Sequence, residues 1–305
     1  MTATTAAEPR AAERRHGGRR TVNTLPLVAP SVIVLLLWML VPLGMTIWFS
    51  FQRYNLITPH LRGFVGFQNY EFLLTDPALW TAMLNTLILV GSVLAITVGF
   101  GTILATLYNA HFPGRSIARL LVIAPFFVMP TVSALIWKNM LMHPVNGLFA
   151  WITNSVLGVG RIDWFADLPL FSIIMIVSWQ WLPFALLILL TAIQSLDQEQ
   201  QEAAIIDGAN PIQMFWYIIL PHLGRAISVV VMIETIFFLT IFAEILVTTS
   251  GGPGLASTNL AYLIYIRALL DFDVGGASAG GVIAIILANI VAIFLIRAVA
   301  KNLDT

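Results

Sequence analysis

Residues 168–194 read LPLFSIIMIVSWQWLPFALLILLTAIQ and contain no aspartate, glutamate, lysine or arginine. About 20 apolar residues are enough for a helix to cross the hydrocarbon core of a bilayer. A helix also satisfies the backbone hydrogen bonds of such a segment without help from water. Similar stretches occur at about 25–50, 82–108, 117–142, 222–248 and 277–299. The sequence therefore predicts an all-α membrane protein with six transmembrane helices.

The composition of the whole chain agrees with this class. Of its 305 residues 59% are hydrophobic and 10% are charged, whereas soluble domains carry roughly 25% charged residues. A soluble protein of this length could not keep so much apolar surface away from water. The chain has no cysteine, which excludes disulfides and thiolate metal sites. The five histidines are scattered, and their spacing predicts no metal site.

The basic residues predict the orientation in the membrane, because cytoplasmic loops carry an excess of lysine and arginine. If the N-terminus is cytoplasmic, the inner side of a six-span chain has ten basic residues: Arg10, Arg14, Arg15, Arg19, Arg20, Arg115, Arg119, Arg225, Arg297 and Lys301. The outer side then has five: Arg53, Arg62, Lys138, Arg161 and Arg267. We therefore expect a multi-pass protein of the cell inner membrane with both termini in the cytoplasm.

The N-terminus is expected to differ from the rest of the chain. Residues 1–21 are rich in alanine, arginine and glutamate without apolar periodicity, which is typical of a disordered tail. The apolar stretch after them is too long for a signal peptide, so we expect it to be retained as the first span. Residues 22–305 then form one transmembrane domain.

The loop between the fourth and fifth spans, residues 195–221, reads SLDQEQQEAAIIDGANPIQMFWYIILP. Helix-forming residues run from Gln198 to Ile206, and Gly208 tolerates a bend after them. A second amphipathic stretch begins at Pro211, a residue suited to the first turn of a helix. The pattern predicts two short helices at the cytoplasmic surface. They could form a docking element for a partner or an interfacial hairpin without one.

The motif residues of this loop resemble the EAA loop of ABC importer permeases, in which two coupling helices occupy a cleft of the ATP-hydrolysing subunit. Asp207 and Asn210 are also suited to capping nearby backbone amides. The segment after the motif, Gly224-Arg225-Ala226, lacks a proline often found in the family. The resemblance assigns coupling to the ATPase to Glu202, Ala203, Ala204, Asp207, Gly208, Ala209, Asn210, Phe215, Leu220 and Pro221.

Other segments resemble the permeases typified by the two membrane subunits of the maltose importer. The segments 64–70 and 85–86 are similar to their first outer loop and second span, and 251–254 and 272–279 to their last outer loop. These similarities imply a maltose-permease-like fold for most of the chain.

Three further segments look closest to the mannitol and glucitol (polyol) branch of this family. They are 241–249, with the sequence IFAEILVTT, the glycine pair at 280–281, and 301–304. The resemblance implies that the substrate is a sugar alcohol or a related sugar.

The chain is expected to carry no ATPase site of its own. Its two lysines, Lys138 and Lys301, do not follow a glycine-rich turn, so it contains no phosphate-binding loop. It is then a transport subunit, not an enzyme, and binds no cofactor itself. The resemblance implies a partner ATPase dimer that holds ATP and magnesium, a second homologous permease, and a periplasmic or lipid-anchored substrate-binding protein. Nucleic acid is not an expected partner.

Candidates for the substrate path are polar or aromatic side chains within spans. Trp179, Gln180 and Trp181 could offer aromatic faces and a hydrogen-bonding group to a polyol, although the tryptophans could also pack against neighbouring helices. Glu244 and Asn289 are further candidates, because ionisable or polar groups at membrane depth usually face a cavity or a partner.

A secondary carrier driven by an ion gradient is the alternative function. Such a carrier needs a coupling carboxylate and usually shows inverted repeats. Glu234 and Glu244 lie in the fifth predicted span, but no intramembrane histidine or arginine partner is evident. Glu234 could instead pair with a polar group of a partner permease. A carrier would also leave the EAA-like loop unexplained.

Overall fold

The structure, a computed structural model, describes residues 25–158 and 160–303. The disordered tail expected at 1–21 lies outside these residues. The chain divides into one unit up to Met45 and a second from Thr46 onward. The first unit contains most of α1 (Leu25–Ser50), which agrees with the predicted span at 25–50.

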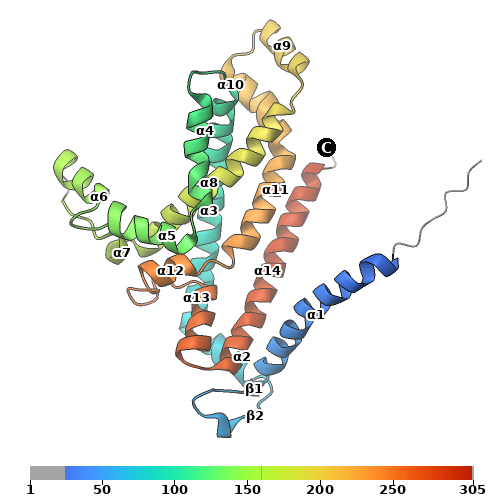
Figure 1. The fold of residues 1–305 in the computed structure, drawn as a ribbon, viewed down its shortest axis with the longest axis vertical. Coiled ribbons are helices and arrows are strands. Elements are labelled where there is room, and N and C mark those ends of the chain that lie inside the picture. Colours follow the sequence, from blue (N-terminus) through green and yellow to red (C-terminus); the bar gives the residue numbers. More distant parts are fainter. Residues whose placement is uncertain (1–24, 159, 304–305) are drawn as a thin grey trace, which may run out of the picture. The chain divides into compact units, whose positions relative to one another are not determined.

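The second unit is almost entirely helical (Figure 1). Its strands β1 and β2 pair antiparallel, with Gln52 opposite Phe64. Its elements are β1 (Gln52–Arg53), a 3-10 turn (Pro59–Leu61), β2 (Gly63–Phe64), α2 (Gln68–Thr75), α3 (Pro77–Asn109), α4 (Arg115–Ile123), a 3-10 turn (Ala124–Phe127), α5 (Pro130–Ile136), a π turn (Trp137–Leu141), α6 (Leu148–Trp151), a π turn (Ile152–Val156), α7 (Trp164–Asp167), α8 (Pro169–Gln194), α9 (Gln198–Ile206), α10 (Pro211–Met214), a π turn (Phe215–Ile219), α11 (Leu220–Phe238), α12 (Ala243–Thr248), α13 (Leu260–Tyr265), a π turn (Ile266–Leu270) and α14 (Val274–Leu303).

Among the described residues, five helices are long and apolar enough to cross a membrane, and a bent pair formed by α4 and α5 makes six if it is counted as one span. This confirms the predicted fold class. Within the second unit, α9 lies at one end of the long helices, and β1, β2 and α2 lie at the other (Figure 1). We call these the α9 end and the hairpin end.

Helix α8 lies at the centre of the second unit. It is the most buried of the long apolar helices and packs against α3, α11 and α12. Its closest neighbour is α3, where a Cβ added to Gly101 would lie 3.0 Å from the Cβ of Ala185. In a bilayer, helices associate through close packing of such small residues, because lipid is as apolar as the side chains.

The third span was predicted over 117–142, where Pro125 and Pro130 favour a kink or a break, and the structure places a sharp break there. The segments Arg115–Phe127 and Pro130–Leu141 meet at an angle of 108°. Met129 has φ of −59° and ψ of +139°, in the polyproline-like region favoured before proline, and Pro130 begins the next helix. The carbonyl of Val128 at the break accepts a hydrogen bond from Gln180 Nε2 at 2.8 Å, so the break leaves this carbonyl satisfied.

The fifth span was predicted over about 222–248 as one segment, and its later end is wrong. The apolar helix begins at Pro211 and ends at Phe238, and Glu244 lies on the separate helix α12. At the break, the Thr240 hydroxyl donates to the Phe237 carbonyl at 2.8 Å. Asn259 Nδ2 donates to the carbonyl of Ile241. These side chains replace the hydrogen bonds of a continuing helix.

Buried polar side chains fix the loop between α12 and α13 to α3 near the hairpin end. Asn85 Nδ2 donates to the carbonyls of Leu255 and Thr258, both at 2.9 Å. The Thr86 hydroxyl accepts from the backbone N–H of Leu260 at 2.9 Å. The pair Asn85-Thr86, one of the segments that resemble sugar permeases, therefore has a structural role.

Replacing Asn85 by leucine is expected to destabilise the protein. Leucine has a similar size but no donor, so the buried carbonyl of Thr258 and the partly buried carbonyl of Leu255 lose their partner, at about 1–3 kcal/mol for a buried group. The midpoint of thermal unfolding of the detergent-purified complex should fall by about 5 °C or more. Thr106→Val is the control, because the Thr106 hydroxyl bonds only within its own helix, to Thr102 O. Equal midpoints for the two variants would contradict the role given to Asn85.

Candidate coupling site

Helix α9 is capped at both ends by its own sequence. The Asp197 carboxylate accepts the N–H of Glu199 at 3.0 Å at the first turn. At the last turn, the N–H of Ala209 bonds to Ala204 O at 2.9 Å and that of Gly208 to Ile205 O at 3.0 Å. This bonding pattern is a Schellman motif, which requires a left-handed residue at the position of Gly208. Gly208 meets the requirement with φ of +85°.

The second helix of the loop starts at Pro211, as predicted, and continues beyond the loop. Asn210 and Gln213 form a reciprocal capping box, with both hydrogen bonds at 2.9 Å, and Pro211 follows the cap. This confirms the capping role expected for Asn210. The helix then continues through the π turn Phe215–Ile219 into α11 without interruption. Pro221 therefore lies inside the long helix and does not mark its start.

The π turn explains how a proline is tolerated there. A proline inside an α-helix lacks one N–H and clashes with the carbonyl four residues earlier. Here the N–H of Leu220 bonds to Phe215 O, five residues earlier. The wider turn gives the Pro221 ring room. The loop helix and the fifth span are thus one continuous rod from Pro211 to Phe238.

Large apolar side chains are exposed on this loop at the α9 end. Ile206 is 84% exposed and Tyr217 is 78% exposed. Exposed apolar patches rimmed by polar groups commonly mark interaction sites. Asp207, Gly208 and Tyr217 also line a hollow of about 310 Å³. We call the exposed apolar set the coupling face; it consists of Ile205, Ile206, Ile212, Trp216 and Tyr217.

The opposite side of the loop packs on the bundle. Ile219 and Leu223 are buried in one cluster with Ile193 and Leu196 of the α8 end. The predicted coupling residues all lie on this loop or the rod. Glu202, Ala203, Asp207, Gly208, Asn210 and Pro221 are exposed, and Ala204, Ala209, Phe215 and Leu220 are partly buried.

The tryptophans predicted for the substrate path lie in aromatic clusters. Trp181 has its ring centroid 4.9 Å from that of Phe237 and 5.4 Å from that of Phe238. Trp179 lies edge-on to Trp137 at 5.7 Å. Such pairs stabilise helix packing. The substrate role of these tryptophans stays a prediction.

The polar candidates for the substrate path occupy different places. Gln180 holds Val128 O through Nε2, and its Oε1 is buried without a hydrogen-bond partner among the described residues. Glu244 is 4% exposed, on α12, which packs against α5 and α8. Asn289 is exposed and bonds to Ile285 O of its own helix. It lines a hollow of about 290 Å³ with Thr235 and Thr240.

Two polar contacts were not predicted from the sequence. Glu234 is fully buried, and its Oε2 lies 2.6 Å from the Thr97 hydroxyl of α3. This partner is in the same chain, while Oε1 of Glu234 is buried without a hydrogen-bond partner among the described residues. His222 contacts the end of α8. Neither contact has a signal in the local sequence, because the partner residues are distant along the chain.

A continuous rod that carries an exposed apolar hairpin can transmit the movement of a docked partner into the membrane. Comparison with known proteins identifies the family. Residues 19–305 match the family described as the inner membrane component of binding-protein-dependent transport systems. The chain belongs to this family.

Relatives of this permease are named as subunits of sugar and related transporters. The chain is 33% identical to the trehalose/maltose transport system permease protein MalF of Thermococcus litoralis, covering 82% of this chain and 85% of the relative. It is 32% identical to the probable ABC transporter permease protein y4oQ of Sinorhizobium fredii, covering 88% and 87%. It is 25% identical to the sn-glycerol-3-phosphate permease protein UgpA of Agrobacterium fabrum, covering 90% and 94%.

A solved structure has the same fold as this permease. A chain from a bacterial ABC transporter that imports the acidic polysaccharide alginate superposes with a TM-score of 0.76 at 23% identity. The match covers 90% of this chain and 94% of that one. The family match and the named relatives make the permease a multi-pass sugar-type ABC transporter subunit of the inner membrane.

Proposed function

We propose that this permease is one of two membrane subunits of an importer that carries a sugar alcohol or a related sugar into the cytoplasm. The energy comes from ATP hydrolysed by a partner subunit that docks on the coupling face. The observation that carries this proposal is the exposed apolar hairpin on a rod that continues into the membrane. When a partner covers apolar side chains of this kind, their removal from water lowers the free energy of the complex.

The proposed coupling mechanism is a rigid-body movement. Closure of the ATPase dimer would shift α9 and α10, and the rod from Pro211 to Phe238 would carry that shift into the membrane. ATP and magnesium belong to the partner, and the permease itself binds no cofactor. The α9 end and both termini then face the cytoplasm. The hairpin end receives substrate from a binding protein on the outer side.

The substrate class is proposed from the segments that resemble polyol permeases. Two of them, 241–249 and 280–281, lie in α12 with its preceding break and in α14. Trp179, Gln180, Trp181, Glu244 and Asn289 remain the proposed contacts along the path. Relatives named for trehalose/maltose and for sn-glycerol-3-phosphate define the alternatives to a sugar alcohol.

Substrate-stimulated ATP hydrolysis in proteoliposomes tests both parts of this proposal. The complete complex and its binding protein are exposed in turn to mannitol, glucitol, maltose, trehalose and sn-glycerol 3-phosphate. We expect a hexitol to raise the hydrolysis rate by about tenfold or more, within the range of effector coupling in proteins. Stimulation by maltose, trehalose or the glycerol phosphate would keep the importer and discard the polyol. Uptake by this chain alone, driven by an ion gradient, would overturn the importer.

A further inference from the structure

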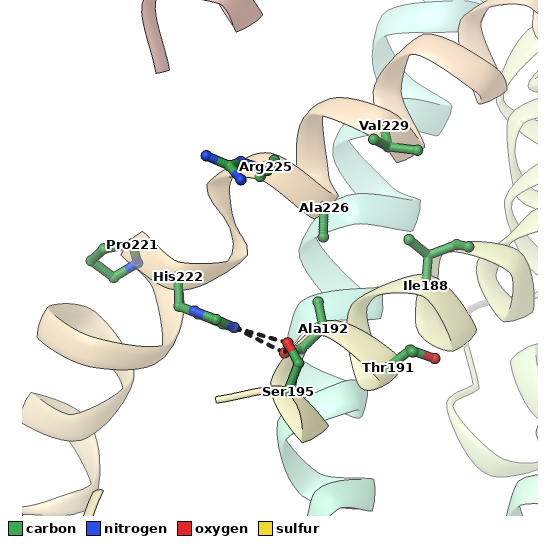
Figure 2. Close-up of a pocket in the computed structure, with 9 residues that line it drawn as sticks. All are labelled: Ile188, Thr191, Ala192, Ser195, Pro221, His222, Arg225, Ala226 and Val229. Carbon is green, nitrogen blue, oxygen red and sulfur yellow. Dashed lines mark hydrogen bonds between the residues drawn. The ribbon is translucent and has the colours of Figure 1, made fainter. Parts of the chain in front are cut away.

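The two ends of the coupling loop meet at a histidine. His222 lies in the first turn of α11, and its Nε2 atom is 3.0 Å from the carbonyl oxygen of Ala192. The same atom is 3.3 Å from Ser195 Oγ. Ala192 is in the last turn of α8, and Ser195 is the residue that caps it. Figure 2 shows the imidazole ring reaching across from α11 to both groups.

The acceptor chemistry fixes which group donates. A carbonyl oxygen carries no hydrogen, so Nε2 of His222 must carry the proton in the bond to Ala192 O. The Ser195 hydroxyl itself donates to Ala192 O at 2.7 Å, so Ser195 Oγ accepts from Nε2. The backbone N–H of Ser195 also bonds to Ala192 O, at 3.1 Å. His222 thus adds a donor from a second helix to a carbonyl that the cap of α8 already bonds.

The connections on the two sides of the coupling loop are unequal. On one side, the loop continues into α11 as an unbroken helix. On the other side, α9 joins α8 through the non-helical residues Ser195, Leu196 and Asp197. A movement of the loop therefore reaches α11 directly but reaches α8 only through a turn and through contacts between the two helices.

Two kinds of contact join α8 to the start of α11. Apolar side chains, Ile193 and Leu196 against Ile219 and Leu223, pack in one cluster, and the hydrophobic effect that drives this packing is non-directional. Beside His222 there is a hollow of about 970 Å³, lined by Thr191, Arg225 and Val229 among others (Figure 2). On this side, the two hydrogen bonds of the exposed His222 ring are directional contacts between α8 and α11.

We propose that His222 is a positioning residue that ties the end of α8 to the start of α11, so that both helices follow the coupling loop during transport. This inference rests on the proposed function of the loop. It assigns His222 a role in how efficiently ATP hydrolysis moves substrate. The ATPase docks on the coupling face, and His222 takes no part in that docking.

Two substitutions of His222 separate the hydrogen bond from the ring. His222→Phe keeps a ring without a donor, and His222→Gln keeps an N–H donor without the ring. In the complete reconstituted transporter, we expect the phenylalanine variant to bind the ATPase normally but to hydrolyse about five times more ATP per substrate molecule moved. The glutamine variant should stay within about twofold of the unchanged protein.

Arg225→Gln is the matched control. Arg225 lines the same hollow, and in Figure 2 its side chain points away from Ala192 and Ser195. We expect its ATP-to-substrate ratio to be unchanged. Ser195→Ala, which removes one of the two acceptors, should raise the ratio by about twofold. This variant keeps the proposal testable if His222→Phe does not assemble.

An unchanged ratio in His222→Phe, or a glutamine variant as impaired as the phenylalanine variant, would overturn the role of His222. A different result would contradict the proposed function: variants with a damaged coupling face would still bind the ATPase. Measuring ATPase co-purification and the ATP-to-substrate ratio on the same preparations distinguishes the two failures.

Discussion

Gly208→Val is expected to reduce substrate-driven transport by at least about tenfold while insertion into the membrane continues. The backbone of Gly208 has φ of +85°, a region where a β-branched residue costs about 1–3 kcal/mol. A Cβ at this position would meet no described atom within 4 Å, so the damage comes from backbone strain and not from a clash. If the backbone at this position leaves the left-handed region to relieve the strain, the two hydrogen bonds of the Schellman motif break and α9 turns away from α10. Uptake of labelled substrate into proteoliposomes measures the loss.

Gly208→Asn is the control for this prediction. Asparagine tolerates the left-handed region much better than valine, so the asparagine variant should keep most of the transport activity. Wild-type uptake by the valine variant would show that the turn does not need to hold its shape during coupling.

Ile206→Asp is expected to prevent the ATPase from binding. Ile206 is 84% exposed and would be covered by the partner in the proposed complex. An unpaired carboxylate in an apolar interface costs several kcal/mol. Since each 1.4 kcal/mol changes affinity about tenfold, the affinity should fall by about a hundredfold or more. Co-purification of the ATPase with tagged permease measures this loss.

Ile57→Asp is the matched control for Ile206→Asp. Ile57 is 66% exposed and lies between β1 and β2 at the hairpin end. The same charge there should leave ATPase binding unchanged. Loss of binding in both variants would indicate general damage to the fold, and retention in both would remove the coupling face from the docking site.

The sequence predicted those parts of the fold that depend on local composition. The helices at 25–50, 82–108 and 168–194 follow from uninterrupted apolar residues, and α9 follows from its helix formers and Gly208. The break in the third span was less predictable. Proline signals a kink, but a turn of 108° also needs a donor for the Val128 carbonyl, and Gln180 supplies it from 52 positions away.

The end of the fifth span could not be read from its own residues. Leu239 to Phe242 contain neither proline nor glycine. Beyond the helix end, Asn259 on a later segment donates to the carbonyl of Ile241, and this partner is not visible in the local sequence. The candidate site shows the same division. The local sequence predicts the roles of Gly208 and Asn210. The role of His222 depends on its contact with the end of α8, which the local sequence does not show.

The π turn Phe215–Ile219 also decides the direction in which the coupling face points. A π turn holds about one residue more than an α-helical turn, and each residue advances an α-helix by about 100° around its axis. Deleting one residue here would restore α-helical geometry and rotate α9 and α10 by about a quarter of a circle relative to α11. A deletion or insertion in this segment therefore rotates the coupling face about the axis of α11.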